Sequence, residues 1–220
     1  MDPRTWTTVD DYLTTNLLGY DEALEGAARV SAEAGLPDIA VSAPQGRFLT
    51  LLVRMVRARS VLEIGTLGGY SAICLARGLP HDGSLITLEA EPRFADVARG
   101  NIDRAGVGDR VDIRVGPALD TLPTLGDDAP FDLVFLDADK ANNAAYFRWA
   151  LEFARPGTVL VVDNVVRGGT IADPASDDPG VRGTQHMFEL MAADPRVDAT
   201  ALQTVAGKGY DGFALALVTG

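Results

Sequence analysis

Short apolar segments alternate with amphipathic segments over residues 60–162, and this alternation restricts the fold more than any other feature. The expected strands cover residues 61–64, 85–89, 111–115, 133–136 and 159–162, and the expected helices between them cover 70–77, 92–105 and 141–153. Strands that alternate with helices of this length join through right-handed crossovers into a mostly parallel sheet. No helix is expected between residues 202–205 and 213–218, so these should pair as an antiparallel hairpin. The pattern predicts an α/β fold.

The N-terminal part of the chain has a helical pattern instead. Apolar residues recur at helical spacing over 9–18, 21–34 and 45–56. The length of 220 residues suits one α/β domain. We therefore expect a single domain, 1–220, with a helical cap over 1–58 and a Rossmann-like core over 59–220. Residues 168–183, rich in Asp, Pro and Gly, are interpreted as a solvated loop, with a mobile lid as the alternative.

Composition excludes several functions. The net charge of -12 argues against nucleic acid or an anionic membrane as a partner, and no apolar run is long enough to span a bilayer. The single cysteine, Cys74, lies in an expected helix and is interpreted as a core residue. Because no disulfide can form within the chain and the N-terminus does not resemble a signal peptide, we expect a cytoplasmic protein. With only His81 and His186 besides Cys74, any metal should be bound through oxygen.

Polar residues follow two of the expected strands. Asp137, Asp139 and Lys140 follow the segment 131–136, and Asp163 and Asn164 follow the segment 159–162. Each group alone has an ordinary structural explanation. Asp163 and Asn164 fit a turn that ends a strand, Asp137 and Asp139 fit the start of a helix, and Lys140 fits a solvated lysine. Ligands of open α/β sheets, however, lie outside the carboxyl ends of the strands. The joint placement predicts one site for a hard cation, with the lysine as a possible base.

A glycine-rich turn follows the first expected strand and precedes a helix, over residues 61–71. Its spacing is not G-x-G-x-x-G, and Glu63 would put a carboxylate beside a pyrophosphate, so NAD is disfavoured. S-adenosylmethionine fits better, because Glu63 suits its cationic methionine part. Glu89, at the end of the next strand, suits its ribose hydroxyls. A turn without a ligand and a solvated strand end are the alternatives.

With these residues in view, the sequence resembles the cation-dependent O-methyltransferases, the family of caffeoyl-CoA and catechol O-methyltransferases and their bacterial relatives. The resemblance begins near Tyr20 and rests on residues 62–71, 88–89, 116–119, 137–140 and 163–164. It implies a class I methyltransferase fold, with a seven-stranded, mostly parallel sheet, an antiparallel last strand and helices on both faces. It also implies a homodimer.

The resemblance further implies a role for each matching residue. The implied cofactor-binding residues are Val41, Glu63, Gly65, Thr66, Ser71, Glu89, Ala118, Asp137 and Asp139. The implied metal ligands are Asp137, Asp163 and Asn164, and the implied catalytic residues are Asp137 and the general base Lys140. The cofactors would be S-adenosylmethionine and a divalent cation, Mg²⁺ first, with Mn²⁺ or Ca²⁺ as alternatives.

The chain departs from the family in the segments that would contact the acceptor. Asn142 and Asn143 stand where plant members usually carry a tyrosine, and residues 165–169 replace what is often an aromatic wall. The N-terminal segment offers no lysine to a coenzyme A thioester. A small catechol, another hydroxylated aromatic compound or a different vicinal diol is therefore expected as acceptor. A metal-independent methyltransferase and an inactive cofactor-binding protein remain the alternatives.

Overall fold

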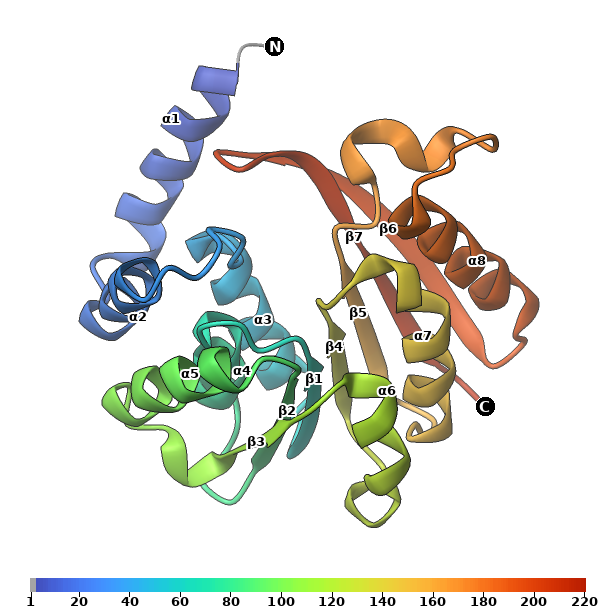
Figure 1. Cartoon of the computed structure of the whole chain (residues 1–220), viewed down its shortest axis with the longest axis horizontal. Coiled ribbons are helices and arrows are strands. Elements are labelled where there is room, and N and C mark those ends of the chain that lie inside the picture. The colour runs from blue at the N-terminus through green and yellow to red at the C-terminus, as the bar shows by residue number, and fades with distance from the viewer. Residues whose placement is uncertain (1–2) are drawn as a thin grey trace.

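The computed structural model describes residues 3–220, which build a seven-stranded sheet with helices on both faces (Figure 1). The sheet order is β3-β2-β1-β4-β5-β7-β6. Neighbours among β1 to β5 pair in parallel, and β7 is antiparallel to both β5 and β6. This confirms the predicted fold class. The strands are β1 (Ser60–Ile64), β2 (Ser84–Glu89), β3 (Val111–Val115), β4 (Leu133–Leu136), β5 (Val159–Asp163), β6 (Val197–Ala206) and β7 (Gly209–Val218).

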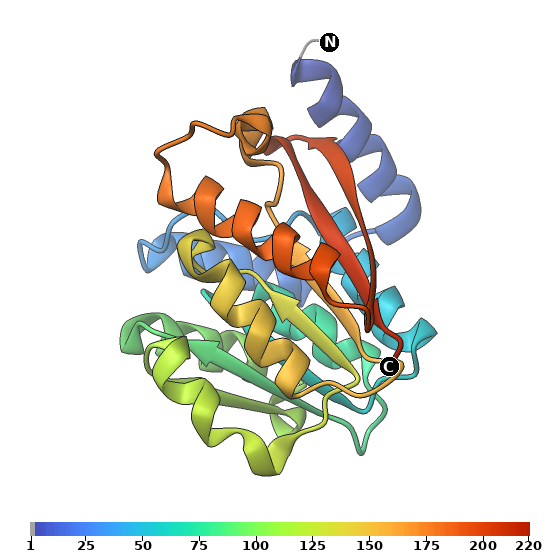
Figure 2. The same cartoon turned by 90° about the vertical axis from the view of Figure 1, so that its right-hand side faces the viewer.

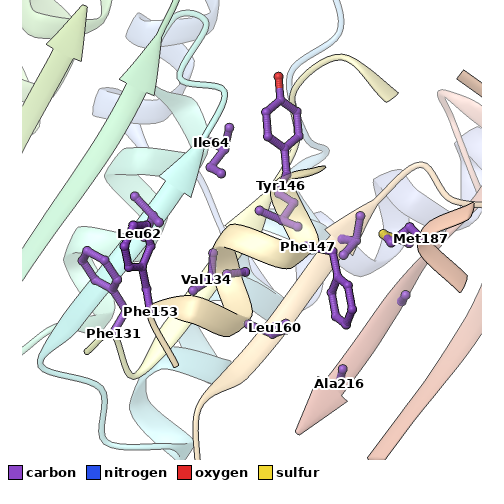
Figure 3. Packing of buried hydrophobic residues seen from close by; sticks show 14 of the residues in the cluster. Leu62, Ile64, Phe131, Val134, Tyr146, Phe147, Phe153, Leu160, Met187 and Ala216 are labelled. Atoms are coloured by element: carbon purple, nitrogen blue, oxygen red, sulfur yellow. The ribbon is translucent and has the colours of Figure 1, made fainter. Parts of the chain in front are cut away.

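Two hydrophobic clusters, one on each face of the sheet, hold the helices in place. Side chains alternate between the faces of a strand, so Leu62 and Ile64 enter one cluster and Val61 enters the other. Figure 3 shows the first cluster, where Phe147 and Met187 pack over the sheet. The helices of that cluster are α7 (Asn143–Glu152) and α8 (Pro179–Ala193), with the short α6 (Ala118–Thr121) beside them. The other cluster holds α3 (Ala43–Met55), α4 (Tyr70–Gly78) and α5 (Pro92–Arg104).

The N-terminal helices are α1 (Pro3–Leu13), which continues as the π-helix η1 (Thr14–Leu18), and α2 (Glu22–Glu33). The predicted helices at 9–18, 21–34 and 45–56 are therefore present, although the first begins earlier. Residues 1 and 2 of the expected cap lie outside the described residues. In Figures 1 and 2 α1 extends beyond the rest of the fold and approaches the β6–β7 turn. There the Gly207 N–H donates to Asp10 Oδ2 at 2.8 Å.

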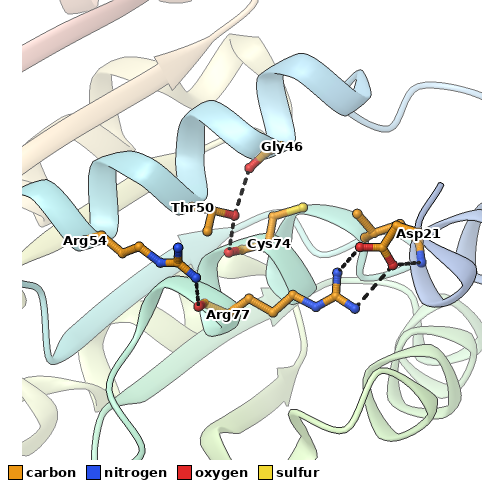
Figure 4. Close-up of polar contacts among 7 residues, drawn as sticks. Asp21, Gly46, Thr50, Arg54, Cys74 and Arg77 are labelled. Carbon is orange, nitrogen blue, oxygen red and sulfur yellow. Dashed lines mark hydrogen bonds and ion pairs between the residues drawn. The ribbon is translucent and has the colours of Figure 1, made fainter. Parts of the chain in front are cut away.

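Polar contacts fasten these helices to the core (Figure 4). Asp21 accepts a hydrogen bond from the Leu24 N–H at the start of α2 and forms an ion pair with Arg77 of α4 at 2.5 Å. Thr50 of α3 donates to the Cys74 carbonyl at 2.8 Å. Cys74 itself is 2% exposed, which confirms it as a core residue. Within residues 3–220, no helix has the length and apolar character that a membrane crossing requires.

The interpretation of residues 168–183 as a solvated loop is wrong for residues 179–183. α8 begins at Pro179, and Asp178 caps it by accepting a hydrogen bond from the Val181 N–H at 2.9 Å. The first part contains the 3-10 helix η6 (Arg167–Ala172). Aspartate, proline and glycine are common at helix starts as well as in loops, so the composition of this segment did not reveal where α8 begins. β6 also begins earlier than predicted, at Val197. The prediction missed its first residues because most of the strand is exposed and shows no alternation of buried and exposed positions.

Met187 offers a test of how much α8 stabilises the fold. Its side chain is fully buried between α8 and the sheet. Met187→Ala should lower the free energy of unfolding by about 2–5 kcal/mol, because it leaves a cavity in the core. Glu189→Ala, on the exposed side of the same helix, should change it by no more than about 0.5 kcal/mol. Urea unfolding measures both values, and equal values would contradict the packing described.

Candidate functional site

A cavity of about 620 Å³ opens at the carboxyl ends of the central strands. It joins the turn after β1, the end of β2 and the turns after β4 and β5. Most of the residues predicted for the site line it, namely Val41, Gly65, Thr66, Ser71, Glu89, Ala118, Asp137, Asp139, Lys140 and Asn164. Glu63 and Asp163 are buried and do not belong to the lining. The structure thus brings the two predicted halves of the site to one cavity.

Gly65 allows the turn after β1 to pass close to the turn after β4. Its φ of 105° is favourable only for glycine, and a Cβ here would lie 2.3 Å from the Asp137 carbonyl oxygen. The Gly65 N–H donates to the Leu88 carbonyl at 3.0 Å, which ties the turn to β2 as well. The backbone is therefore exposed to the cavity without an intervening side chain.

Glu89 is held in a fixed orientation at the end of β2. Its Oε2 accepts a hydrogen bond from the Leu67 N–H at 2.7 Å, and its Oε1 accepts one from the Glu91 N–H at 3.0 Å. A carboxylate has about four acceptor positions, so both oxygens retain the capacity to accept from a ligand. This arrangement suits a pair of ribose hydroxyls.

Glu63 is a fully buried carboxyl group in the middle of the sheet. Its Oε2 accepts a hydrogen bond from Thr87 at 2.6 Å, whereas its Oε1 has no partner among the described residues. Burial raises the pKa of Glu63 to about 8, with a smaller contribution from the charges of Asp137 and Glu89 and against the opposing effect of hydrogen bonds from Ser71 and Thr87. Because Glu63 is fully buried and does not line the cavity, it would act on a cationic group such as the ammonium of S-adenosylmethionine through a bridging group such as water.

Asp137 and Asp163 lie side by side because their strands are in register. Leu136 of β4 pairs with Val162 of β5, and each aspartate is the next residue in its strand direction. Burial and the charge of Asp137 raise the pKa of Asp163 to about 6. Burial also raises the pKa of Asp137, although the neighbouring Lys140 opposes this.

Asn164 completes the predicted cation ligands. Its φ of 53° is left-handed, a conformation that asparagine tolerates better than most residues, and the side chain lines the cavity. The described residues contain no group of three or more His, Cys, Asp or Glu side chains that could hold a metal ion. The predicted set is different, with two carboxylates and one amide. Two acids that repel each other, followed directly by an asparagine, suit a hard dication.

Lys140 forms an ion pair with Asp137, with Nζ and Oδ1 2.8 Å apart. Its side chain is only 10% exposed, because α8 covers the turn that carries it. A Cβ on Gly183 of α8 would lie 2.4 Å from the Lys140 carbonyl oxygen, so the two segments touch through their backbones. α8, which the sequence did not reveal, therefore positions the predicted base.

Further residues line the cavity besides those predicted for the site. Tyr146 is one of them, and its hydroxyl donates a hydrogen bond to Asp139. Ile39, Phe94 and Arg167 were not predicted to line it. They come from segments far apart in the sequence. Only for Arg167 did the sequence indicate a place near the site, because it is three residues after Asn164.

Comparison with known proteins agrees with this geometry. A family model described as O-methyltransferase matches residues 18–217. A catechol O-methyltransferase from Mycobacterium tuberculosis is 57% identical over 96% of this chain and 94% of its own length. The O-methyltransferase from Bacillus cereus in complex with SAH superposes with a TM-score of 0.98, at 54% identity over 99% of this chain and 100% of that one. The O-methyltransferase TomG from Streptomyces achromogenes, in complex with SAM, gives 0.97 at 53% identity, with 100% of both chains covered.

Glu63→Gln should make the ligand-free protein more stable. Because its pKa is raised from 4.5 to about 8, the folded wild-type protein loses stability as the pH rises from 4.5 through 8, and glutamine avoids this loss. The difference in Tm between variant and wild type should grow between pH 5 and pH 9. Differential scanning calorimetry at both pH values measures it. A constant difference would show that Glu63 is not held neutral by burial.

Proposed function

The chain belongs to the O-methyltransferase family, and we propose that it transfers a methyl group to a hydroxyl of a catechol or similar vicinal diol with the help of a divalent cation. That the enzyme is an S-adenosylmethionine-dependent O-methyltransferase follows from its named relatives and the SAM-bound structure. The same relatives argue against an inactive cofactor-binding protein. The class of acceptor and the dependence on a divalent cation are the two parts that we propose.

One observation carries this proposal, namely that a single cavity joins the two kinds of site. The ends of β1 and β2 supply the glycine turn and Glu89 to its lining for the cofactor, with Glu63 buried behind them. The ends of β4 and β5 supply Asp137 and Asn164 to its lining for a cation, with Asp163 buried beside Asp137. Neighbouring strands are about 4.8 Å apart, so a methyl donor over β1 and an acceptor over β4 and β5 would be adjacent.

The chemistry is displacement at a sulfonium methyl group by a phenolic oxygen, and the difficulty is a phenol pKa of about 10. A bound divalent cation would supply acidification and positioning of the acceptor hydroxyl. Asp137, Asp163 and Asn164 would hold it. Lys140, in its neutral form, would accept the hydroxyl proton at Nζ. The buried walls around Tyr146 and Phe147 keep these groups in fixed positions.

The Lys140–Asp137 ion pair gives some support to a second candidate, a metal-independent methyltransferase. At 2.8 Å the lysine neutralises the aspartate directly, without any cation. In that case Asp163, whose pKa is raised by burial and by the charge of Asp137, would be structural. The dependence of turnover on divalent cations separates the two candidates.

EDTA should abolish methyl transfer to a catechol, and added Mg²⁺ or Mn²⁺ should restore it. Asp163→Ala should lose this activity while still binding S-adenosylhomocysteine, because the cofactor residues lie mainly on β1 and β2. Asp177→Ala removes an equivalent charge from the exposed loop and serves as the control. Product formation and calorimetric binding measure the two properties. Full turnover after thorough chelation would favour the metal-independent candidate.

Lys140→Ala should slow the chemical step by roughly 10²–10⁴-fold, the contribution expected of a general base. Single-turnover kinetics isolates this step from binding and product release. The affinity for S-adenosylhomocysteine should change little. If the single-turnover rate stayed within a factor of two or so, another group would have to accept the proton.

We also propose that the enzyme is a homodimer formed through its N-terminal helices. Large apolar side chains are exposed there, including Tyr12 at 67%, Leu17 at 73% and Met55 at 67%. Leu17→Glu should shift the mass in light scattering from dimer to monomer, whereas Thr15→Glu, at a neighbouring exposed polar position, should not. A wild-type monomer at micromolar concentration would contradict the proposal.

The remaining expectations concern location and partners. The negative net charge and the lone buried Cys74 support a cytoplasmic enzyme with no nucleic acid or membrane partner, and we retain this as part of the proposal.

A further inference from the structure

Among the residues that the structure describes, 3–220, two cationic side chains belong to the cavity lining, Arg167 and Lys140. The two lie close together, on either side of the start of α8. A Cβ on Gly180 would be 3.3 Å from Lys140 Cβ and 3.9 Å from Arg167 Nε. The site therefore has two basic side chains on the same wall, and the proposed mechanism uses only Lys140.

The two cations differ in their partners. Lys140 is paired with Asp137. Arg167 has no carboxylate within 4.0 Å among residues 3–220, and its buried Nε has no hydrogen-bond partner there. A charged group without a counter-ion at a cavity wall is unfavourable by itself, so an anionic ligand that pairs with the guanidinium gains affinity.

Hydrogen bonds fix the backbone around Arg167, and this fixed backbone places the residue at the cavity wall. The Arg167 N–H donates to Asp211 Oδ1 at 3.1 Å, and the Val166 N–H donates to the same oxygen at 2.9 Å. Arg167 also adopts a left-handed φ of 55°. Such a conformation in a non-glycine residue is maintained only where the surroundings fix it.

The position of Arg167 assigns it to the acceptor and not to the cofactor. It follows β5, whereas the glycine turn follows β1 and Glu89 ends β2. β4 lies between β1 and β5, so two strand spacings, about 10 Å, separate Arg167 from the glycine turn. Asn164, a proposed ligand on the acceptor side, is three residues away.

We propose that Arg167 binds a carboxylate on the methyl acceptor, so that the preferred substrates are vicinal diols carrying a carboxylate group. This rests on the proposed function, because it extends the catechol from its two hydroxyls to a second recognised group. A guanidinium presents a planar pair of donors that matches a carboxylate. The acids elsewhere in the cavity would repel such a group, which makes Arg167 its place of binding.

The test compares protocatechuate with its uncharged amide, two catechols that differ in the charge of one substituent. In the wild type, kcat/KM for protocatechuate should exceed that for the amide. In Arg167→Gln the ratio of the two kcat/KM values should fall by about 10–100-fold, the effect of losing a charge-assisted hydrogen bond. The two catechols differ in acidity, but this difference affects the ratio equally in wild type and variant and cancels when the two ratios are compared. Arg182→Gln, on the exposed face of α8, is the matched control and should leave the ratio unchanged.

Calorimetric binding of both compounds to the protein, with S-adenosylhomocysteine and Mg²⁺ present, gives a second readout. A wild-type preference for protocatechuate that Arg167→Gln removes supports the inference. An equal ratio in wild type and variant, or a fall in S-adenosylhomocysteine affinity in the variant, would overturn it. If no catechol were methylated, the proposed function would fail, and the binding comparison would still decide the role of Arg167.

Discussion

The register of the parallel strands β1, β4 and β5 is the constraint on which the site depends. Ile64, Leu136 and Val162 are paired across the three strands, so the polar residues that follow them emerge together at one edge. Gly65 then permits backbone contact between two of the turns. A shift of one residue in any strand would turn its apolar residues to the wrong face and remove an acid from the site.

This arrangement concentrates negative charge in a buried place. Glu63 and Asp163 have raised pKa values because burial disfavours their ionised forms, and Asp137 adds repulsion to both. The fold tolerates these acids because two apolar clusters hold the sheet from either side. Cationic ligands, such as the ammonium of the cofactor and a divalent cation, would relieve the same repulsion. Binding and stability are therefore linked at this edge of the sheet.

Much of the fold and of the site could be predicted from the sequence, because both follow from local patterns. Buried strands appear as apolar runs, and Asp137 and Asp163 stand directly after two of them. α8 could not be recognised, because its Pro179-Gly180 start resembles a loop. The lining by Ile39 and Phe94 depends on contacts between distant segments, and so does the lack of a hydrogen-bond partner for Arg167 Nε within residues 3–220. The sequence pattern contains no record of such contacts.

The proposed mechanism depends on a divalent cation, which oxygen ligands at the ends of β4 and β5 would hold. Electron paramagnetic resonance of Mn²⁺ tests it directly, since free and protein-bound Mn²⁺ give different signals. Titration of the S-adenosylhomocysteine-bound enzyme should show one Mn²⁺ site per chain, which a catechol perturbs and which Asp163→Ala removes. Wild-type protein that binds no more Mn²⁺ than this variant would contradict the account.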